Sequence, residues 1–275
     1  MIDITKFEDK NLLFKHLKDN KSFYIAQKKS AMKRGDSYCG QLPIVDKSEF
    51  ETKDMAVTSE AMPTGKIRAK VIINTSNILD SHYDVHIGNI WKKSLSENKY
   101  VLHLDSHCRK FEYVISDSPD VTAYVKSISW KSLGYDYSGS TNALIFDSYI
   151  SEKRNSEMFT QYREGWVKFH SVGMGYVSLF LCINSEEKYY IEEKTNWDKY
   201  RPEVVNGEEA DKLGFFWAVT EAKLIEGSAV VLASNSITPT ESVEDINEAG
   251  KSTSQIEPSN DTQKVSKFIY NPNLI

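Results

Sequence analysis

The longest apolar stretch of the sequence, FFWAVTEAKLIEGSAVVL at residues 215–232, is rich in the aromatic and β-branched side chains that favour a β-strand. Residues 166–183 have the same character, and in KIRAKVIINTSNILD at 66–80 apolar residues alternate with polar ones as they do in a strand. Helical patterns are few and short, such as those at 88–99 and 150–165. Many strands with few helices predict a β-rich α+β fold, built as a barrel or a closed sheet.

The composition changes along the chain and divides it into four segments. Residues 1–65 form an N-terminal extension, either a propeptide or a cover for the barrel, with a short amphipathic helix near Leu12–Leu17. Residues 66–235 hold the strand patterns and are expected to form the main domain. Residues 236–266 contain no aromatic residue and many Ser, Thr, Glu and Asn, which predicts a disordered linker. The last segment, KFIYNPNLI at 267–275, is expected to be a short anchor.

Charge and apolar patterning exclude several classes of partner. Lys and Arg number 34 against 39 Asp and Glu, for a net charge of −5, so a nucleic-acid partner is not expected. No apolar run approaches the roughly 18–20 residues that span a bilayer, and the charged N-terminus lacks the apolar segment of a signal peptide. Cys39, Cys108 and Cys182 lie far apart without a CxxC pair, which predicts a cytoplasmic protein without a disulfide framework.

Two histidine pairs with H-x-x-x-H spacing raise the question of a metal site. On a strand, four residues separate two Cα atoms by roughly 13 Å, so His103 and His107 cannot bind one ion if YVLHLDSH is a strand. His82 and His86 lie in a segment expected to be a loop and could share an ion, although two exposed loop histidines are the simpler interpretation. With no HExxH motif and no cysteine nearby, neither a metal nor another cofactor is expected.

The segment GWVKFHSVGMGYVS at 165–178 contains the best candidate nucleophile, Ser171. His170 is its chain neighbour, but adjacent side chains of a strand point to opposite faces, so the base must come from another strand. His107, at the end of YVLHLDSH, is the best placed by residue type. Gly173 and Gly175 share the face of Ser171 and would let a peptide backbone approach the hydroxyl. Spacing alone favours a buried serine beside a bulge over a catalytic one.

Two carboxylates interrupt the apolar stretch at 215–232. Glu221 and Glu226 must each be solvated or paired, because burying a lone carboxylate is costly. Glu221 is best explained as a solvent-facing residue of an edge strand. Glu226 precedes Gly227 and Ser228, two small residues that leave space around it.

Four segments, in a consistent order over roughly residues 66–240, resemble motifs of the tailed-phage prohead (capsid maturation) protease family. FHSVGMGY resembles the serine strand of that family, and LIEGSAVVLASN resembles its E-x-S-x-V strand with an Asn-containing exit. ILDSHYDVHIGNIWKKSL is similar to its Asp-rich turn and short helix. YVLHLDSH resembles its histidine strand, although many members have His-Asp there, whereas in this chain Asp105 precedes His107. No one motif is highly specific, but the four together in order form a specific pattern.

The resemblance implies a fold similar to herpesvirus assemblin, a closed β-barrel surrounded by helices, and a serine-histidine site. Carried over by position, Ser171 is the nucleophile and His107 the general base, with backbone N–H groups near Gly173 for the oxyanion. The third member varies among such proteases. Glu226 is favoured here, and the weaker candidates are Glu221, His103 and Asp105.

The resemblance further implies a serine endopeptidase that acts by acyl transfer. Its expected substrates are scaffold or delta segments of the major capsid protein, and the protease itself, inside a procapsid in the cytoplasm of an infected bacterium. A homo-oligomer is also expected, since assemblin-type barrels often need a dimer. Two alternatives remain: a non-catalytic capsid assembly or scaffolding module with the same barrel, and a metal-dependent hydrolase that uses His82 and His86.

Overall fold

The computed structural model describes residues 2–30, 63–98 and 100–247, and the chain has a strand-rich α+β fold with a few helices. No helix among these residues is long and apolar enough to cross a membrane. The strands are β1 (Pro63–Thr75), β2 (Asp84–His86), β3 (Leu102–Asp105), β4 (Val114–Asp117), β5 (Val121–Ser129), β6 (Ser140–Ser151), β7 (Phe169–Ile183), β8 (Phe215–Val230) and β9 (Thr240–Asn247). The helices are α1 (Lys10–Asp19), α2 (Lys21–Ser30), α3 (Lys92–Glu97), α4 (Ser156–Arg163), α5 (Ile191–Tyr200) and α6 (Gly207–Leu213).

The strands form two sheets. A four-stranded antiparallel sheet has the order β5-β6-β1-β9, and a five-stranded sheet has the order β2-β8-β3-β4, with β7 paired to β8. The strands predicted within 66–80, 166–183 and 215–232 are thereby confirmed as β1, β7 and β8. No strand pairing among the described residues closes either sheet into a barrel.

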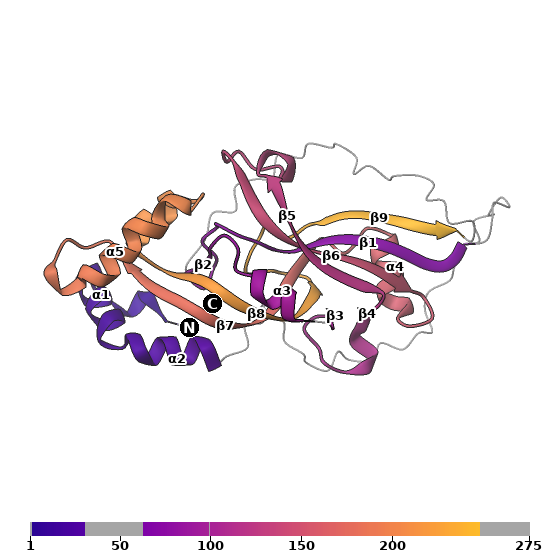
Figure 1. Ribbon diagram of the computed structural model, residues 1–275, viewed down its shortest axis with the longest axis horizontal. Coiled ribbons are helices and arrows are strands. Elements are labelled where there is room, and N and C mark those ends of the chain that lie inside the picture. Colours follow the sequence, from indigo (N-terminus) through magenta and orange to yellow (C-terminus); the bar gives the residue numbers. More distant parts are fainter. Residues whose placement is uncertain (1, 31–62, 99, 248–275) are drawn as a thin grey trace.

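The apolar sequence of β8 fits its central position in the larger sheet. It pairs antiparallel with β7 from Phe215 to Val230, and on its other edge it pairs parallel with β2 and then β3. A strand with neighbours on both edges and packed layers on both faces needs apolar side chains almost throughout. Figure 1 shows β7 and β8 running together as the long ribbon pair of the molecule.

The two sheets pack against each other at Gly227 of β8. A Cβ atom added to this glycine would lie 2.5 Å from the ring of Phe146 on β6 and 2.9 Å from Cδ1 of Ile73 on β1. Phe146 and Ile73 both belong to the main buried cluster, together with Leu144 and Trp217. The absence of a side chain at 227 therefore permits the close approach of the two sheets.

Helices α1, α2 and α5 gather around the end of the β7–β8 pair that is far from the smaller sheet (Figure 1). The helix predicted near Leu12–Leu17 is confirmed as α1, which begins after the N-cap Asp9 and buries Leu13, Phe14 and Leu17 in the main core. The buried carboxylate of Glu193 on α5 accepts from Lys18 at 2.6 Å and Lys21 at 2.8 Å. Two cations thus compensate one buried charge and tie the N-terminal helices to α5.

The prediction that a disordered linker begins at residue 236 was wrong for its first part. Ile237 and Thr238 are buried, and β9 pairs with β1. The Thr238 hydroxyl also donates to the backbone carbonyl of His170 at 2.6 Å. Pairing with β1 gives this polar segment backbone hydrogen bonds that its composition did not indicate. The remainder of the predicted linker and the predicted anchor lie outside the described residues.

The packing at Gly227 makes a testable prediction. Gly227→Ala is expected to lower the free energy of unfolding by about 1–3 kcal/mol, because the added methyl group overpacks the contact with Phe146 and Ile73. Gly175→Ala is the matched control, since its new Cβ would come no closer than 4.0 Å to Ile225. Urea unfolding measures the free energy of unfolding of both variants, and equal values would contradict this account of Gly227.

Candidate active site

The register of β7 and β8 brings the predicted serine strand and the two-carboxylate strand together. Ser171 lies directly opposite Ser228, and Gly173 lies opposite Glu226. Cross-strand partners of an antiparallel pair place their side chains on the same face, with Cβ atoms about 4.5–5.5 Å apart. Ser171, Glu226 and Ser228 therefore share one face of the sheet, and all three are buried. The opposite face, with Val172 and Met174, packs into the core.

Gly173 is a glycine because the Glu226 side chain occupies the space beside it. A Cβ atom at 173 would overlap Oε1 of Glu226 and lie 2.6 Å from its carboxyl carbon. The expected location of Gly173 on the Ser171 face is confirmed by this contact. Its immediate role is to leave room for the carboxylate, which the sequence did not indicate.

A left-handed turn after β3 places His107. Strand β3 ends at Asp105, and Ser106 and His107 have φ values of 50° and 57°. Such values are uncommon for residues other than glycine. The Ser106 N–H donates to the carbonyl of Ala229 at 2.9 Å, so the turn is attached to β8. His107 therefore lies beyond the strand, not at its last position as the pattern of YVLHLDSH suggested.

His107 and Glu226 form a direct buried pair. Nδ1 of His107 lies 2.6 Å from Oε1 of Glu226, and each side chain is only 1% exposed. A carboxylate can only accept, so Nδ1 carries the proton in this contact. In the neutral imidazole Nε2 then has the lone pair, which is the state that a general base requires.

The structure brings Ser171 to the same face as this pair without a completed serine–histidine bond. Among the described residues, the hydroxyl of Ser171 has no hydrogen-bond partner. Its cross-strand partner Ser228 accepts from the backbone N–H of His107 at 3.1 Å. Serine–base contacts are often long without substrate and shorten when substrate binds.

His170 belongs to a separate buried chain of hydrogen bonds on the other face. Its Nδ1 lies 3.1 Å from the carbonyl of Thr238, and its Nε2 lies 2.9 Å from the hydroxyl of Tyr162 on α4. The same hydroxyl lies 3.0 Å from Nε2 of His103, whose Nδ1 lies 2.9 Å from Ser148. The prediction that His170 faces away from Ser171 is confirmed. His103 contacts neither Ser171 nor Glu226 in this network.

The direction of every bond in this chain follows from one fixed acceptor. The Thr238 carbonyl can only accept, so His170 carries its proton on Nδ1 and accepts from Tyr162 at Nε2. Tyr162 then accepts from His103 Nε2–H, and Ser148 donates to His103 Nδ1. Both histidines are neutral in this pattern. Burial lowers the pKa of His170 to about 4 and holds the pKa of His103 well below its ordinary value.

The two weaker carboxylate candidates lie in other contacts. Glu221 pairs with Lys93 at 3.3 Å in a partly exposed ion pair, as expected for a solvent-facing residue. Asp105 accepts from the hydroxyl of Ser106 at 2.7 Å. Of the carboxylates predicted for the third position, Glu226 is the one that contacts His107.

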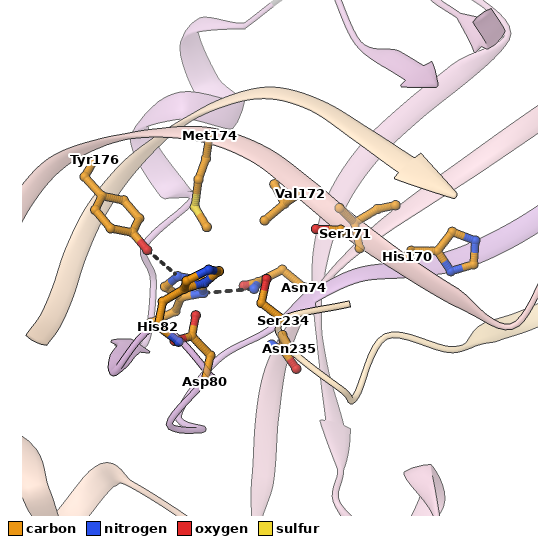
Figure 2. Close-up of a pocket in the computed structure, with 12 residues that line it drawn as sticks. Asn74, Asp80, His82, His170, Ser171, Val172, Met174, Tyr176, Ser234 and Asn235 are labelled. Atoms are coloured by element: carbon orange, nitrogen blue, oxygen red, sulfur yellow. Dashed lines mark hydrogen bonds between the residues drawn. The ribbon is translucent and has the colours of Figure 1, made fainter. Parts of the chain in front are cut away.

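A pocket adjoins Ser171 on the Val172–Met174–Tyr176 side of β7 (Figure 2). Its other residues are Ile73, Asn74, Asp80, His82, His86, His170, Ser234 and Asn235. Neither His107 nor Glu226 lines it. Figure 2 shows His82 and Asp80 on the far side of the pocket from β7.

The pocket is where a metal site at His82 and His86 would have to form. His86 lies on β2, not in a loop, and is buried with Nδ1 2.9 Å from Asn74 and Nε2 3.3 Å from Tyr176. Asp80 accepts from the N–H groups of His82 and Asp84 through one carboxylate oxygen. In the part of the chain that the structure describes, no group of three or more His, Cys, Asp or Glu side chains could hold a metal ion.

Sequence reasoning missed one covalent bond and four residues of these networks, which are Ser148, Tyr162, Ser228 and Thr238. Ser228 is bonded to both His107 and Glu226, and its E-x-S spacing, which puts both side chains on one face of a strand, was the available signal. Tyr162 lies within the helical pattern at 150–165, which gave no signal of a hydrogen-bonding role. Cys108 is disulfide-bonded, so the expectation of no disulfide was wrong at this residue, whereas Cys182 is a free buried thiol.

The buried histidines predict how stability depends on pH. Because the folded pKa of His170 is depressed from 6.5 to about 4, the unfolded chain binds more protons between these values. The free energy of unfolding should therefore fall as pH drops from 6.5 towards 4, by about 1.4 kcal/mol per pH unit for each proton. His103 should add to this slope, since its pKa is also lowered.

Urea unfolding at several pH values between 7 and 4.5 measures this dependence. His170→Gln should reduce the slope by about one proton, whereas His16→Gln, on α1 outside the cluster, serves as the control. An unchanged slope in His170→Gln would show that His170 does not carry the acid sensitivity.

Comparison with known proteins found no relative: no family model, no curated protein and no solved structure matches the chain. The arrangement of Ser171 on β7, His107 in the turn after β3 and Glu226 on β8 is therefore the evidence from which a function has to be argued.

Proposed function

We propose that this chain is a serine endopeptidase with Ser171 as nucleophile, His107 as general base and Glu226 as the third member. One observation carries the proposal: Nδ1 of His107 contacts the buried carboxylate of Glu226 at 2.6 Å on the face of β7 that holds Ser171. A carboxylate in this position keeps the proton on Nδ1 and stabilises the imidazolium that forms when Nε2 accepts a proton. The three residues come from three strand regions distant in sequence.

In the proposed reaction, Nε2 of His107 takes the proton of Ser171 as the Ser171 oxygen attacks a peptide carbonyl. The carbonyl oxygen becomes an oxyanion, for which backbone N–H groups near Gly173 are the proposed donors. His107 then gives its proton to the leaving amine as the peptide bond breaks, and an acyl-enzyme on Ser171 remains. A water molecule then loses a proton to His107 as it attacks the acyl carbon, the bond from that carbon to the Ser171 oxygen breaks, and His107 returns the proton to this oxygen.

The proposed substrates follow from the resemblance to prohead proteases. They are scaffold or delta segments of a major capsid protein, and the chain itself, inside the procapsid in an infected bacterium. The closed barrel of assemblin and a homo-oligomeric state also belong to this proposal. The strand-rich α+β fold, and a histidine–carboxylate pair beside the serine strand, are what supports it.

A non-catalytic assembly module is the first alternative. Such a module would need no buried carboxylate beside an imidazole, and burying that carboxylate costs free energy that only its partners offset. The Glu226–His107 pair therefore favours the catalytic proposal. A metal-dependent hydrolase is the second alternative. It would use His82 and His86, which both line the pocket in Figure 2.

Covalent labelling tests the nucleophile without knowledge of the substrate. A fluorophosphonate is expected to label the wild-type chain on Ser171, and Ser171→Ala to lose the label, because the probe reacts with an activated serine. Glu226→Gln and His107→Ala should each slow labelling by at least about 10²-fold, since the base and its orienting group act as a unit. Ser178→Ala, on the same strand opposite Glu221, is the matched control.

The same variants test the substrate. Co-expressed with the major capsid protein of its phage, the wild type should cleave that protein and its own chain, and Ser171→Ala should cleave neither. Labelling of Ser171→Ala at the wild-type rate would refute the serine mechanism. Cleavage that a chelator abolishes while Ser171→Ala retains it would favour the metal alternative.

The contact between Gly173 and Glu226 gives an independent prediction. Gly173→Ala should slow labelling by about 10²-fold or more, because the new methyl group displaces the carboxylate from His107. Gly175→Ala changes the same strand face where the nearest atom is 4.0 Å away and should label normally. Equal labelling of both variants would contradict the assigned role of Glu226.

A further inference from the structure

The hydroxyl of Ser228 joins the two members of the histidine–carboxylate pair. It donates to Oε2 of Glu226 at 2.6 Å and accepts from the backbone N–H of His107 at 3.1 Å. Oε1 of the same carboxylate contacts Nδ1 of His107. The three residues thus form a closed ring of hydrogen bonds in which each member contacts the other two.

Ser228 itself is not suited to be a nucleophile. Its residue is fully buried at 0% exposure, and its proton is directed to a carboxylate. Ser171, directly across the strand pair, is 7% exposed and has no hydrogen-bond partner among the described residues. The two facing serines therefore differ in environment: the Ser228 hydroxyl makes two hydrogen bonds, whereas the Ser171 hydroxyl makes none among the described residues.

Two features of the ring require an orienting group. A carboxylate on a two-carbon side chain can rotate, and only one orientation directs Oε1 at His107. The backbone of His107 has a φ of 57°, which is unfavourable for a residue with a side chain. One hydroxyl contacts both the carboxylate and this backbone.

We propose that Ser228 is a positioning residue of the site: it holds the Glu226 carboxylate and the left-handed His107 backbone in the geometry that keeps the proton on Nδ1. This inference rests on the proposed function for its effect on catalysis. Its structural part, the orientation of the His107–Glu226 contact, holds whether or not Ser171 is a nucleophile.

The test compares Ser228→Ala with wild type in two measurements. The first is the fluorophosphonate reaction, resolved into the maximal labelling rate and the probe concentration at half-maximal rate. The maximal rate is expected to fall by roughly 10- to 100-fold, the effect of a lost hydrogen bond to a charged group. The half-maximal concentration should change less than about twofold, because Ser228 does not contact the probe.

The second measurement is the proton NMR resonance of His107 Nδ1–H, recorded in a Ser171→Ala background so that labelling and self-cleavage play no part. A short bond to a carboxylate shifts this proton downfield, and Ser228→Ala should weaken the shift or broaden the signal beyond detection. Ser148→Ala is the matched control, since it removes a buried hydroxyl bonded to His103 instead. It should leave both the rate and the His107 resonance as in wild type.

Ser228→Cys keeps the site usable if Ser228→Ala does not fold. A thiol is somewhat larger than a hydroxyl group and donates only weakly, so the labelling rate of Ser228→Cys should also fall well below that of wild type. A rate within about twofold of wild type in a folded Ser228→Ala or Ser228→Cys protein, with the downfield resonance in place, would overturn the inference. Labelling of Ser171→Ala would instead refute the proposed function, and the NMR comparison would still decide the role of Ser228.

Discussion

The contact of the Glu226 carboxylate with His107 and Ser228 is the interaction on which the candidate site depends. A carboxylate with 1% exposure is tolerated only where donors surround it, and an imidazole N–H and a serine hydroxyl are the donors that the structure shows. Gly173 leaves the space that the carboxylate occupies, and the left-handed turn at Ser106–His107 delivers the imidazole to it. The glycine at 173 and the left-handed turn at Ser106–His107 are thus both explained by the one buried carboxylate that they accommodate.

The two sides of β7 use histidine in opposite ways. On one side, the chain Ser148–His103–Tyr162–His170–Thr238 satisfies every donor and acceptor with neutral groups, and burial keeps both imidazoles neutral. This network links β3, β6, α4 and β7 in the core, so it stabilises the strands that hold the site. On the other side, Nδ1 of His107 contacts the buried Glu226 carboxylate, so this imidazole is oriented by a charged group and not by neutral ones.

Alternation at 66–80 predicted β1, and the apolar, β-branched and aromatic content of 166–183 and 215–232 predicted β7 and β8, because these are properties of each segment by itself. The alternation of side chains along a strand also correctly separated His170 from Ser171. Local patterns failed where a distant partner decided the outcome. Strand β9 exists because β1 offers it a free edge, His107 leaves the strand because the Ala229 carbonyl holds the turn, and His86 lies on β2 because β8 pairs with it.

By itself, the sequence determined the strand-rich class of the fold, the faces of β7 and the residue types available for acyl-transfer chemistry. It could not determine which carboxylate meets His107, since Glu221 and Glu226 differ only by a few positions on one strand. The tertiary structure decided this through register: Gly173 opposite Glu226 leaves room for a carboxylate, whereas Glu221 lies opposite Ser178 and pairs with Lys93 at the surface. Register is a property of two strands together, so neither strand's sequence contains it alone.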